Sequence, residues 1–407
     1  MEPDYPLQGS SLDLPLEDVL SFTPQRRRDF ILRILAELSK AIDRNEMALK
    51  ARVPLDREMR DLRRLVRAPY DKFLYLDERT YKRNVLGHGS PGGTHTYWSR
   101  KFMWRMTTRK GDLSKLISSR NAGLVNKLDK LLDGGNESLS LHRRDNLPAV
   151  RTILTFLQMD WGVGCAFPPF HARFFAETYL PHDTERELVV LDPCAGWGGR
   201  LLGSLSAHRR QKVTYVGIDP ERRNRDAYEG IHRRIKIYLK SEIPGPREAF
   251  FYFRPFEDWI KSKTASRFLG QVDLVITSPP YFAAEIYNNQ NAKQSVNRYP
   301  TYEVWRESFY RTLIEGAYQL LREGGVFVLN IADVSSARSL ERDARVLAKE
   351  TGFRSIDFYK LAMPLSPSIR GKTKHVVKVD GKDFKYGPCF VFKKPESGRT
   401  RNEASMN

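Results

Sequence analysis

A short turn at residues 278–281 brings together a hydroxyl, two prolines and an aromatic ring, in the order Ser278, Pro279, Pro280, Tyr281. It directly follows an apolar run that ends at Thr277 and has the composition of a buried strand. Adjacent prolines fix the backbone and remove two N–H donors, so their carbonyl oxygens have no ladder partners. A turn with these groups is suited to hold a planar amine, although a strand followed by an ordinary proline turn has the same letters.

A second motif lies upstream and begins with the apolar run 188–191, which reads as a fully buried parallel strand closed by Asp192 and Pro193. Gly196 and Gly198 then allow the backbone to bend sharply and approach a ligand before a helix starts near residue 200. The spacing lacks the G-x-G-x-x-G fingerprint of dinucleotide-binding turns.

The next apolar run, 213–218, predicts a second strand that ends at Asp219. A carboxylate there can accept both hydroxyls of a ribose, which suits an adenosyl group and NAD equally. Asp219 alone therefore leaves the cofactor open, and its combination with the turn at 278–281 decides the interpretation.

With the glycine motif first along the chain and the turn at 278–281 after it, the two motifs resemble those of the amino-group DNA methyltransferases, which transfer a methyl group from S-adenosylmethionine to the exocyclic nitrogen of cytosine or adenine. The resemblance covers about residues 161–394, with Cys194 at a position where the family commonly has Phe and Trp197 at a normally small position. In that family the tetrapeptide holds the target base, and the version beginning with Ser is usual among cytosine N4 enzymes. No metal is implied.

The resemblance also implies the site residues. The expected catalytic residues are Ser278, Pro279, Pro280 and Tyr281. The expected S-adenosylmethionine-binding residues are Phe167, Asp192, Pro193, Ala195, Gly196, Gly198, Asp219, Glu257 and Asp258. Glu257 and Asp258 occupy the region where the family places an acid near the adenine amine, and helix N-capping explains either acid equally well.

Alternating strands and helices over 151–394 predict an α/β catalytic domain, a doubly wound Rossmann-like sheet of the class I methyltransferase type. We expect a third strand within 249–259, a helix ending at Gly324 and Gly325 before another strand, and a closing antiparallel hairpin from 353–361 and 386–393.

An added, mainly helical and basic domain is predicted for residues 25–150, with disordered tails at 1–24 and 395–407. Apolar residues recur at helical spacing within 26–53, and further helices are expected near 55–67 and 112–132.

The net charge is +19, and residues 79–120 carry ten Lys or Arg against the single acid Asp112, interleaved with aromatic residues. This composition favours a nucleic-acid contact over a solvated basic face. The expected contact residues are Arg100, Lys101, Arg105, Arg109 and Lys110.

A second basic cluster spans 370–394, where a flank of the active site and a soluble surface hairpin are equal alternatives. Residues 281–298 read either as a lid over a flipped nucleotide or as an ordinary polar loop.

Three cysteines without CxxC spacing argue against a disulfide framework and a structural zinc site, and no apolar stretch approaches membrane-spanning length. The start of the chain lacks the basic and hydrophobic regions of a signal peptide, so we expect a soluble, cytoplasmic, DNA-associated protein. The sequence carries no signal for an oligomeric state.

These observations predict a site-specific DNA methyltransferase that acts on the N4 amine of a flipped cytosine. An adenine N6 enzyme, an RNA methyltransferase and a catalytically silent nucleic-acid-binding subunit remain alternatives. A restriction–modification partner, an orphan regulator and a phage protein fit the sequence equally.

Overall fold

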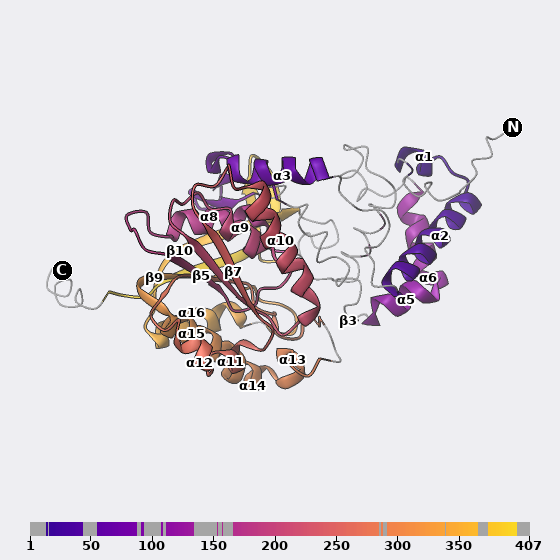
Figure 1. Cartoon of the computed structure of the whole chain (residues 1–407). Helices are drawn as coiled ribbons and strands as arrows, with labels where there is room; N and C mark the ends of the chain where they lie inside the picture. The colour runs from indigo at the N-terminus through magenta and orange to yellow at the C-terminus, as the bar shows by residue number, and fades with distance from the viewer. Residues whose placement is uncertain are drawn as a thin grey trace.

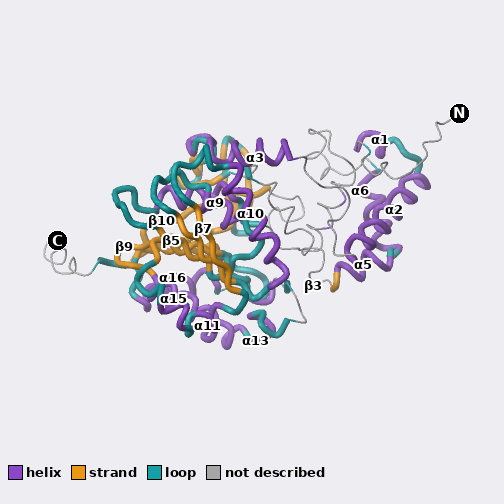
Figure 2. Tube along the Cα trace, in the orientation of Figure 1, coloured by secondary structure: helices purple, strands orange, loops and turns teal. Residues whose placement is uncertain are grey.

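The computed structural model of the protein describes residues 14, 16–43, 55–87, 91–92, 107–108, 111–133, 153, 157, 166–284, 286–287, 291–337, 339–364 and 373–396. Helices lie on both faces of a central sheet, and a group of N-terminal helices lies to one side of it (Figure 1). The strands of the sheet gather in the middle of the larger body (Figure 2).

The central sheet has ten strands in the order β1-β2-β10-β12-β9-β8-β5-β6-β7, with β11 paired to β12. The strands are β1 (Leu74–Asp77), β2 (Lys82–Leu86), β5 (Leu188–Asp192), β6 (Val213–Ile218), β7 (Arg247–Tyr252), β8 (Val272–Thr277), β9 (Leu321–Asn330), β10 (Arg354–Pro364), β11 (Val376–Val379) and β12 (Lys382–Lys393). A separate pair is formed by β3 (Thr107–Thr108) and β4 (Gly111–Asp112).

The strand directions match the predicted fold class. β5 to β9 pair in parallel, and the chain runs outward from β5 through β6 to β7 before it returns to β8 on the other side of β5. β12 is antiparallel to both β9 and β10 and forms the closing hairpin. The doubly wound α/β sheet with an antiparallel hairpin is thus confirmed.

Consecutive residues of the central strands face opposite helix layers, because side chains alternate along a strand. Val190 of β5 packs into the core of the first layer, and Leu191 packs into the core of the second. The first layer contains α8 (Pro169–Tyr179), α9 (Gly199–Leu205) and α10 (Arg225–Tyr238). The second contains α11 (Phe256–Trp259), α12 (Lys263–Ser266), α14 (Tyr302–Trp305), the π-helix η7 (Arg306–Arg311), α15 (Thr312–Leu320) and α16 (Leu340–Thr351).

The described part of residues 25–150 lies in two places. One group of helices, α1 (Leu16–Leu20), α2 (Pro24–Asp43), α5 (Leu113–Ser119) and α6 (Ala122–Leu132), shares a core that also includes Trp197 of the glycine loop. By contrast, α3 (Leu55–Arg67) packs on the core of α8, and β2 pairs in parallel with β10. Residues 55–86 therefore extend the sheet instead of joining the helical group, which the sequence did not predict.

One predicted helix end is wrong. We expected a helix to end at Gly324 and Gly325, but α15 ends at Leu320 and both glycines lie within β9. The Gly324 N–H donates to the carbonyl of Lys394, and the Lys394 N–H donates to the carbonyl of Gly325. These backbone hydrogen bonds pair both glycines with Lys394, the residue after β12, so their N–H and carbonyl groups are not available to cap a helix. Among the described residues, no helix is both long and apolar enough to cross a membrane.

Candidate active site

The predicted site residues follow the carboxyl ends of the parallel strands. β5 ends at Asp192, β6 ends one residue before Asp219, and β8 ends one residue before Ser278. In open parallel sheets these ends meet at one edge, where ligands bind. The fold therefore brings both sequence motifs to the same edge.

Asp192 links the two motifs from inside the protein. Its side chain is fully buried, and Oδ1 accepts hydrogen bonds from the Thr277 hydroxyl at 3.0 Å and from the Cys194 N–H at 3.2 Å. Oδ2 accepts from Tyr215 Oη and Arg200 Nε, each at 2.7 Å. The carboxylate is thus occupied by protein donors, so Asp192 holds the glycine loop and β8 in place.

Gly196 forms the centre of the loop and needs its left-handed conformation, with φ of +58°. Its N–H donates to Asp219 Oδ2 at 2.8 Å, and its carbonyl accepts from Tyr228 Oη at 2.6 Å and Asn224 Nδ2 at 3.0 Å. All three partners lie shortly after β6 in the chain: Asp219 directly follows the strand, Asn224 precedes the first residue of α10, and Tyr228 lies within α10. The loop is therefore held rigidly over the end of that strand.

The pKa of Asp219 is raised to about 7, mainly by burial and further by the charge of Glu221. Two backbone donors oppose this effect, the N–H groups of Gly196 and Glu221, each at 2.8 Å from one carboxylate oxygen. Since a carboxylate offers about four acceptor positions, Asp219 retains capacity for further donors.

The other expected residues of the loop region lie deeper. Phe167 is 8% exposed and lies beneath the Arg200 guanidinium, 5.4 Å from its carbon to the ring centroid. Pro193 and Ala195 are buried as well, and the Ala195 N–H donates to the carbonyl of Ile218. These three residues therefore support the loop from behind, in contrast to the partly exposed Gly196.

Glu257 and Asp258 share one partner, Arg298. The Arg298 guanidinium donates to both carboxylate oxygens of Asp258 at 3.0 and 3.1 Å and to Glu257 Oε1 at 3.1 Å. Tyr299 Oη also donates to Glu257 Oε1, at 3.2 Å, while Glu257 Oε2 is buried without a hydrogen-bond partner among the described residues. Burial raises the pKa of Glu257.

The turn at 278–281 is organised by a residue that we did not predict, Asn330. Ser278 Oγ lies 3.2 Å from Asn330 Oδ1, and Tyr281 Oη lies 3.1 Å from the same oxygen. Asn330 is the last residue of β9 and is 8% exposed. The only sequence signal for it is a polar residue at the end of a long apolar strand.

The described part of 281–298 contacts several neighbours at this edge. The Tyr287 ring lies 6.0 Å from the Trp197 ring of the glycine loop, and Asn291 Nδ2 lies 3.5 Å from the Pro220 carbonyl. The segment continues through α13 (Ser295–Arg298) to the ion pairs of Arg298. It thus spans from the glycine loop to α11, whereas residues 285 and 288–290 lie outside the described part.

The five predicted nucleic-acid contacts, Arg100, Lys101, Arg105, Arg109 and Lys110, also lie outside the described residues. In the second basic cluster, Lys374 lies 2.6 Å from Asp333, shortly after the end of β9, and 3.4 Å from Glu341.

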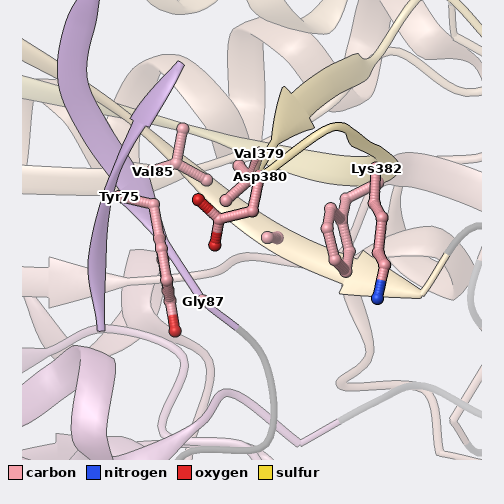
Figure 3. A pocket seen from close by; sticks show the side chains of 8 residues that line it. Tyr75, Val85, Gly87, Val379, Asp380 and Lys382 are labelled. Carbon is pink, nitrogen blue, oxygen red and sulfur yellow. The ribbon is translucent and has the colours of Figure 1, made fainter. Parts of the chain in front are cut away.

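A cavity of about 180 Å³ lies elsewhere, between β1 and β2 on one side and β11 and β12 on the other (Figure 3). Tyr75, Val85, Val379 and Lys382 are among its lining residues. None of the residues that line it belongs to the glycine loop or the turn at 278–281, so we do not place the substrate there.

No protein-family model and no curated protein matches the chain. Solved structures similar to it include a SAM-dependent O-methyltransferase from Thermotoga maritima, with 11% identity, a TM-score of 0.34 and coverage of 58% of this chain and 69% of that one. A SAM-dependent methyltransferase from Methanosarcina mazei has 11% identity and a TM-score of 0.32, covering 56% and 98% of the two chains. TrmN from Thermus thermophilus has 16% identity and a TM-score of 0.32, and the match covers 60% of this chain and 67% of TrmN. Likeness at this level supports no inference about activity, so the function rests on the geometry of the site.

Proposed function

We propose that the protein is an S-adenosylmethionine-dependent methyltransferase acting on the exocyclic amine of a nucleic-acid base, the N4 amine of cytosine in DNA. The observation that carries this proposal is the hydrogen bond between Thr277 and Asp192, which joins the amine-holding turn to the glycine loop. A rigid link of this kind suits a reaction in which two substrates must meet in line.

The residues of the glycine loop fit the cofactor. Asp219 has acceptor capacity for ribose hydroxyls, and Glu257 Oε2, for which the described residues provide no side-chain partner, suits an adenine amine. When bound, S-adenosylmethionine supplies a methyl group on a positively charged sulfur. Asp192 acts through the loop, because its own oxygens are occupied by Thr277, Tyr215, Arg200 and Cys194.

The turn at 278–281 provides for the amine. The lone pair of a cytosine amine is delocalised into the ring, so the amine is a weak nucleophile. Ser278 Oγ and the Pro279 carbonyl accept its two hydrogens and draw them out of the ring plane, which frees the lone pair. Tyr281 stacks on the ring, held by its hydroxyl on Asn330.

The transfer is balanced without a further reactant. With S-adenosylmethionine bound, the nitrogen lone pair would form the new bond to the methyl carbon, and the electrons of the broken carbon–sulfur bond would stay on sulfur. The methylated nitrogen then loses one proton to solvent. The base must leave the duplex to reach this turn, at a cost of a few kcal/mol that is offset by stacking and hydrogen bonds.

Methylation at carbon 5 of cytosine with Cys194 as the nucleophile is disfavoured. That reaction needs a thiolate nucleophile, and reactive thiolates have lowered pKa values. Burial and the nearby carboxylates of Asp192 and Asp219 instead raise the pKa of the Cys194 thiol well above its ordinary value.

The test is incubation of the full chain with unmethylated duplex DNA and labelled S-adenosylmethionine, followed by digestion to nucleosides and mass spectrometry. N4-methylcytosine is the expected product, and N6-methyladenine would move the assignment to adenine. A parallel incubation uses RNA, and incorporation into RNA but not into DNA would make RNA the substrate. No incorporation, with cofactor binding intact in calorimetry, would leave a catalytically silent subunit.

A matched pair of variants ties the product to the turn. Ser278→Ala removes the proposed acceptor, and we expect a loss of about 100-fold in rate, as for other transition-state hydrogen bonds. Ser266→Ala removes an exposed hydroxyl whose partner among the described residues is the Lys263 carbonyl in α12, so its rate should equal that of the parent.

A further inference from the structure

The side-chain amide of Asn330 has a fixed orientation. Its Nδ2 donates to the Pro388 carbonyl of β12 at 2.8 Å, which leaves Oδ1 facing Ser278 and Tyr281. The reverse orientation would place Oδ1 against the Pro388 carbonyl, oxygen against oxygen. Gly387 leaves room for this bond, because a Cβ there would lie 3.3 Å from Nδ2.

This orientation fixes the direction of the hydrogen bond made by Ser278. A carbonyl-type oxygen only accepts, so at a separation of 3.2 Å Ser278 must donate its hydroxyl hydrogen to Asn330 Oδ1. A hydroxyl has one hydrogen and two lone pairs. Once the hydrogen is committed, Ser278 Oγ presents only lone pairs to the substrate.

We propose that Asn330 is the positioning residue that makes Ser278 a hydrogen-bond acceptor, and that it thereby selects a ring amine over a ring carbonyl at the same position. The inference rests on the proposed function. An amine hydrogen meets a lone pair of Ser278, whereas the carbonyl of uracil or thymine meets an acceptor and is rejected. Rejection of this type is strong because it leaves facing acceptors unpaired.

The test compares Asn330→Leu, which keeps a similar volume and has no acceptor, with Asn84→Leu. Asn84 is a matched control because its Nδ2 also donates to a strand carbonyl, that of Phe358 at 2.9 Å, away from the site. We expect Asn330→Leu to lower kcat by about 10-fold, the scale of one hydrogen bond. The Kd of S-adenosylhomocysteine should be unchanged, and Asn84→Leu should not alter kcat.

Two further readouts separate positioning from structural support. In a Ser278→Ala, Tyr281→Phe background, adding Asn330→Leu should change the single-turnover rate by less than about 2-fold, because contacting residues are not additive. With uracil in place of the mapped target cytosine, the parent should bind more weakly, and Asn330→Leu should reduce this difference because the Ser278 hydroxyl can then rotate and donate.

Three results would overturn the inference. The first is an unchanged kcat for Asn330→Leu, and the second is an equal loss of rate from Asn330→Leu in the parent and in the Ser278→Ala, Tyr281→Phe background. The third is an unchanged preference of Asn330→Leu for cytosine over uracil. Should Asn330→Leu fail to fold, Asn330→Asp is the second variant: when protonated it donates to the Pro388 carbonyl and keeps an acceptor for both hydroxyls, whereas when ionised it places an oxygen against that carbonyl. Its kcat relative to the parent should therefore rise as pH falls, and a ratio that does not change with pH would contradict us. Absence of methylation by the parent is a different result and removes the proposed function together with the inference.

Discussion

Thr277 donates its hydroxyl hydrogen to Asp192 Oδ1 at 3.0 Å, and both residues are fully buried. Each is the last residue of its strand, Thr277 of β8 and Asp192 of β5. Because these strands are neighbours in the sheet, one hydrogen bond couples the start of the glycine loop to the start of the turn at 278–281.

Thr277→Val should weaken both the fold and the loop. The change removes one of the donors of a buried carboxylate, which costs about 1–3 kcal/mol in the free energy of unfolding. Urea unfolding gives this value, and calorimetry should show weaker binding of S-adenosylhomocysteine. Thr214→Val is the control, since Thr214 donates to Glu187, whose side chain is 41% exposed. Equal stability changes for the two variants would contradict the coupling.

Gly198→Ala should destabilise the fold through its backbone conformation and through the contact with Ile231, a buried side chain. Gly198 has φ of +85°, and a Cβ would lie 2.6 Å from Ile231 Cδ1. Gly270→Ala is matched, because Gly270 has φ of +63° but no atom within 4 Å of its Cβ position. Backbone strain costs about 1–3 kcal/mol at either site, so any excess at Gly198 measures the clash. The stabilities of the two variants are compared by thermal unfolding. A smaller loss of stability for Gly198→Ala than for Gly270→Ala would exclude a steric requirement at Gly198.

Asp219 should make stability depend on pH. Its pKa is raised from 3.8 to about 7 in the folded protein, so the folded state binds more protons than the unfolded chain between these values. Its contribution to the free energy of unfolding therefore falls as pH rises from about 4 to about 7. Asp219→Asn should flatten this part of the profile, and an unaltered slope in urea titrations would refute the assignment.

The affinity for the cofactor should rise with pH, in contrast to the free energy of unfolding. Ribose hydroxyls donate best to an ionised carboxylate, which Asp219 becomes as pH rises through about 7. We expect S-adenosylhomocysteine to bind more tightly at pH 8 than at pH 6 in calorimetry. The Asn variant should bind with little dependence on pH over that range, and a parent-like dependence in it would point to another group.

Arg298→Gln should loosen the segment that spans the site edge. It removes the bidentate bond to Asp258 and the contact to the buried Glu257, leaving Glu257 with Tyr299 alone at Oε1. We expect faster proteolysis within 291–299 and weaker cofactor binding. Arg60→Gln breaks an exposed pair with Asp56 in α3 and should change neither, as exposed pairs contribute about 0–1 kcal/mol. Parent-like proteolysis of Arg298→Gln would mean that other contacts hold the segment.

Local sequence patterns were enough to predict much of the fold and part of the candidate site. The spacing of apolar residues predicted the helix at 55–67, found as α3 (Leu55–Arg67), and the buried runs that became β5, β6 and β8. Gly196 and Gly198 were recognisable because a strand that turns sharply into a helix needs residues free of Cβ strain. These features depend on neighbours in the sequence, which is why the sequence alone determined them.

The tertiary structure decided which distant residues meet. Asn330 reaches Ser278 because β9 pairs with β8, and its amide is oriented by Pro388 because β12 pairs with β9 on the other side. Arg298 meets Glu257 because residues 291–299 fold back over α11, and β2 joins the sheet through β10, more than 270 residues along the chain. Such contacts depend on strand order and chain reversal, and the local preferences of single residues carry no information about either.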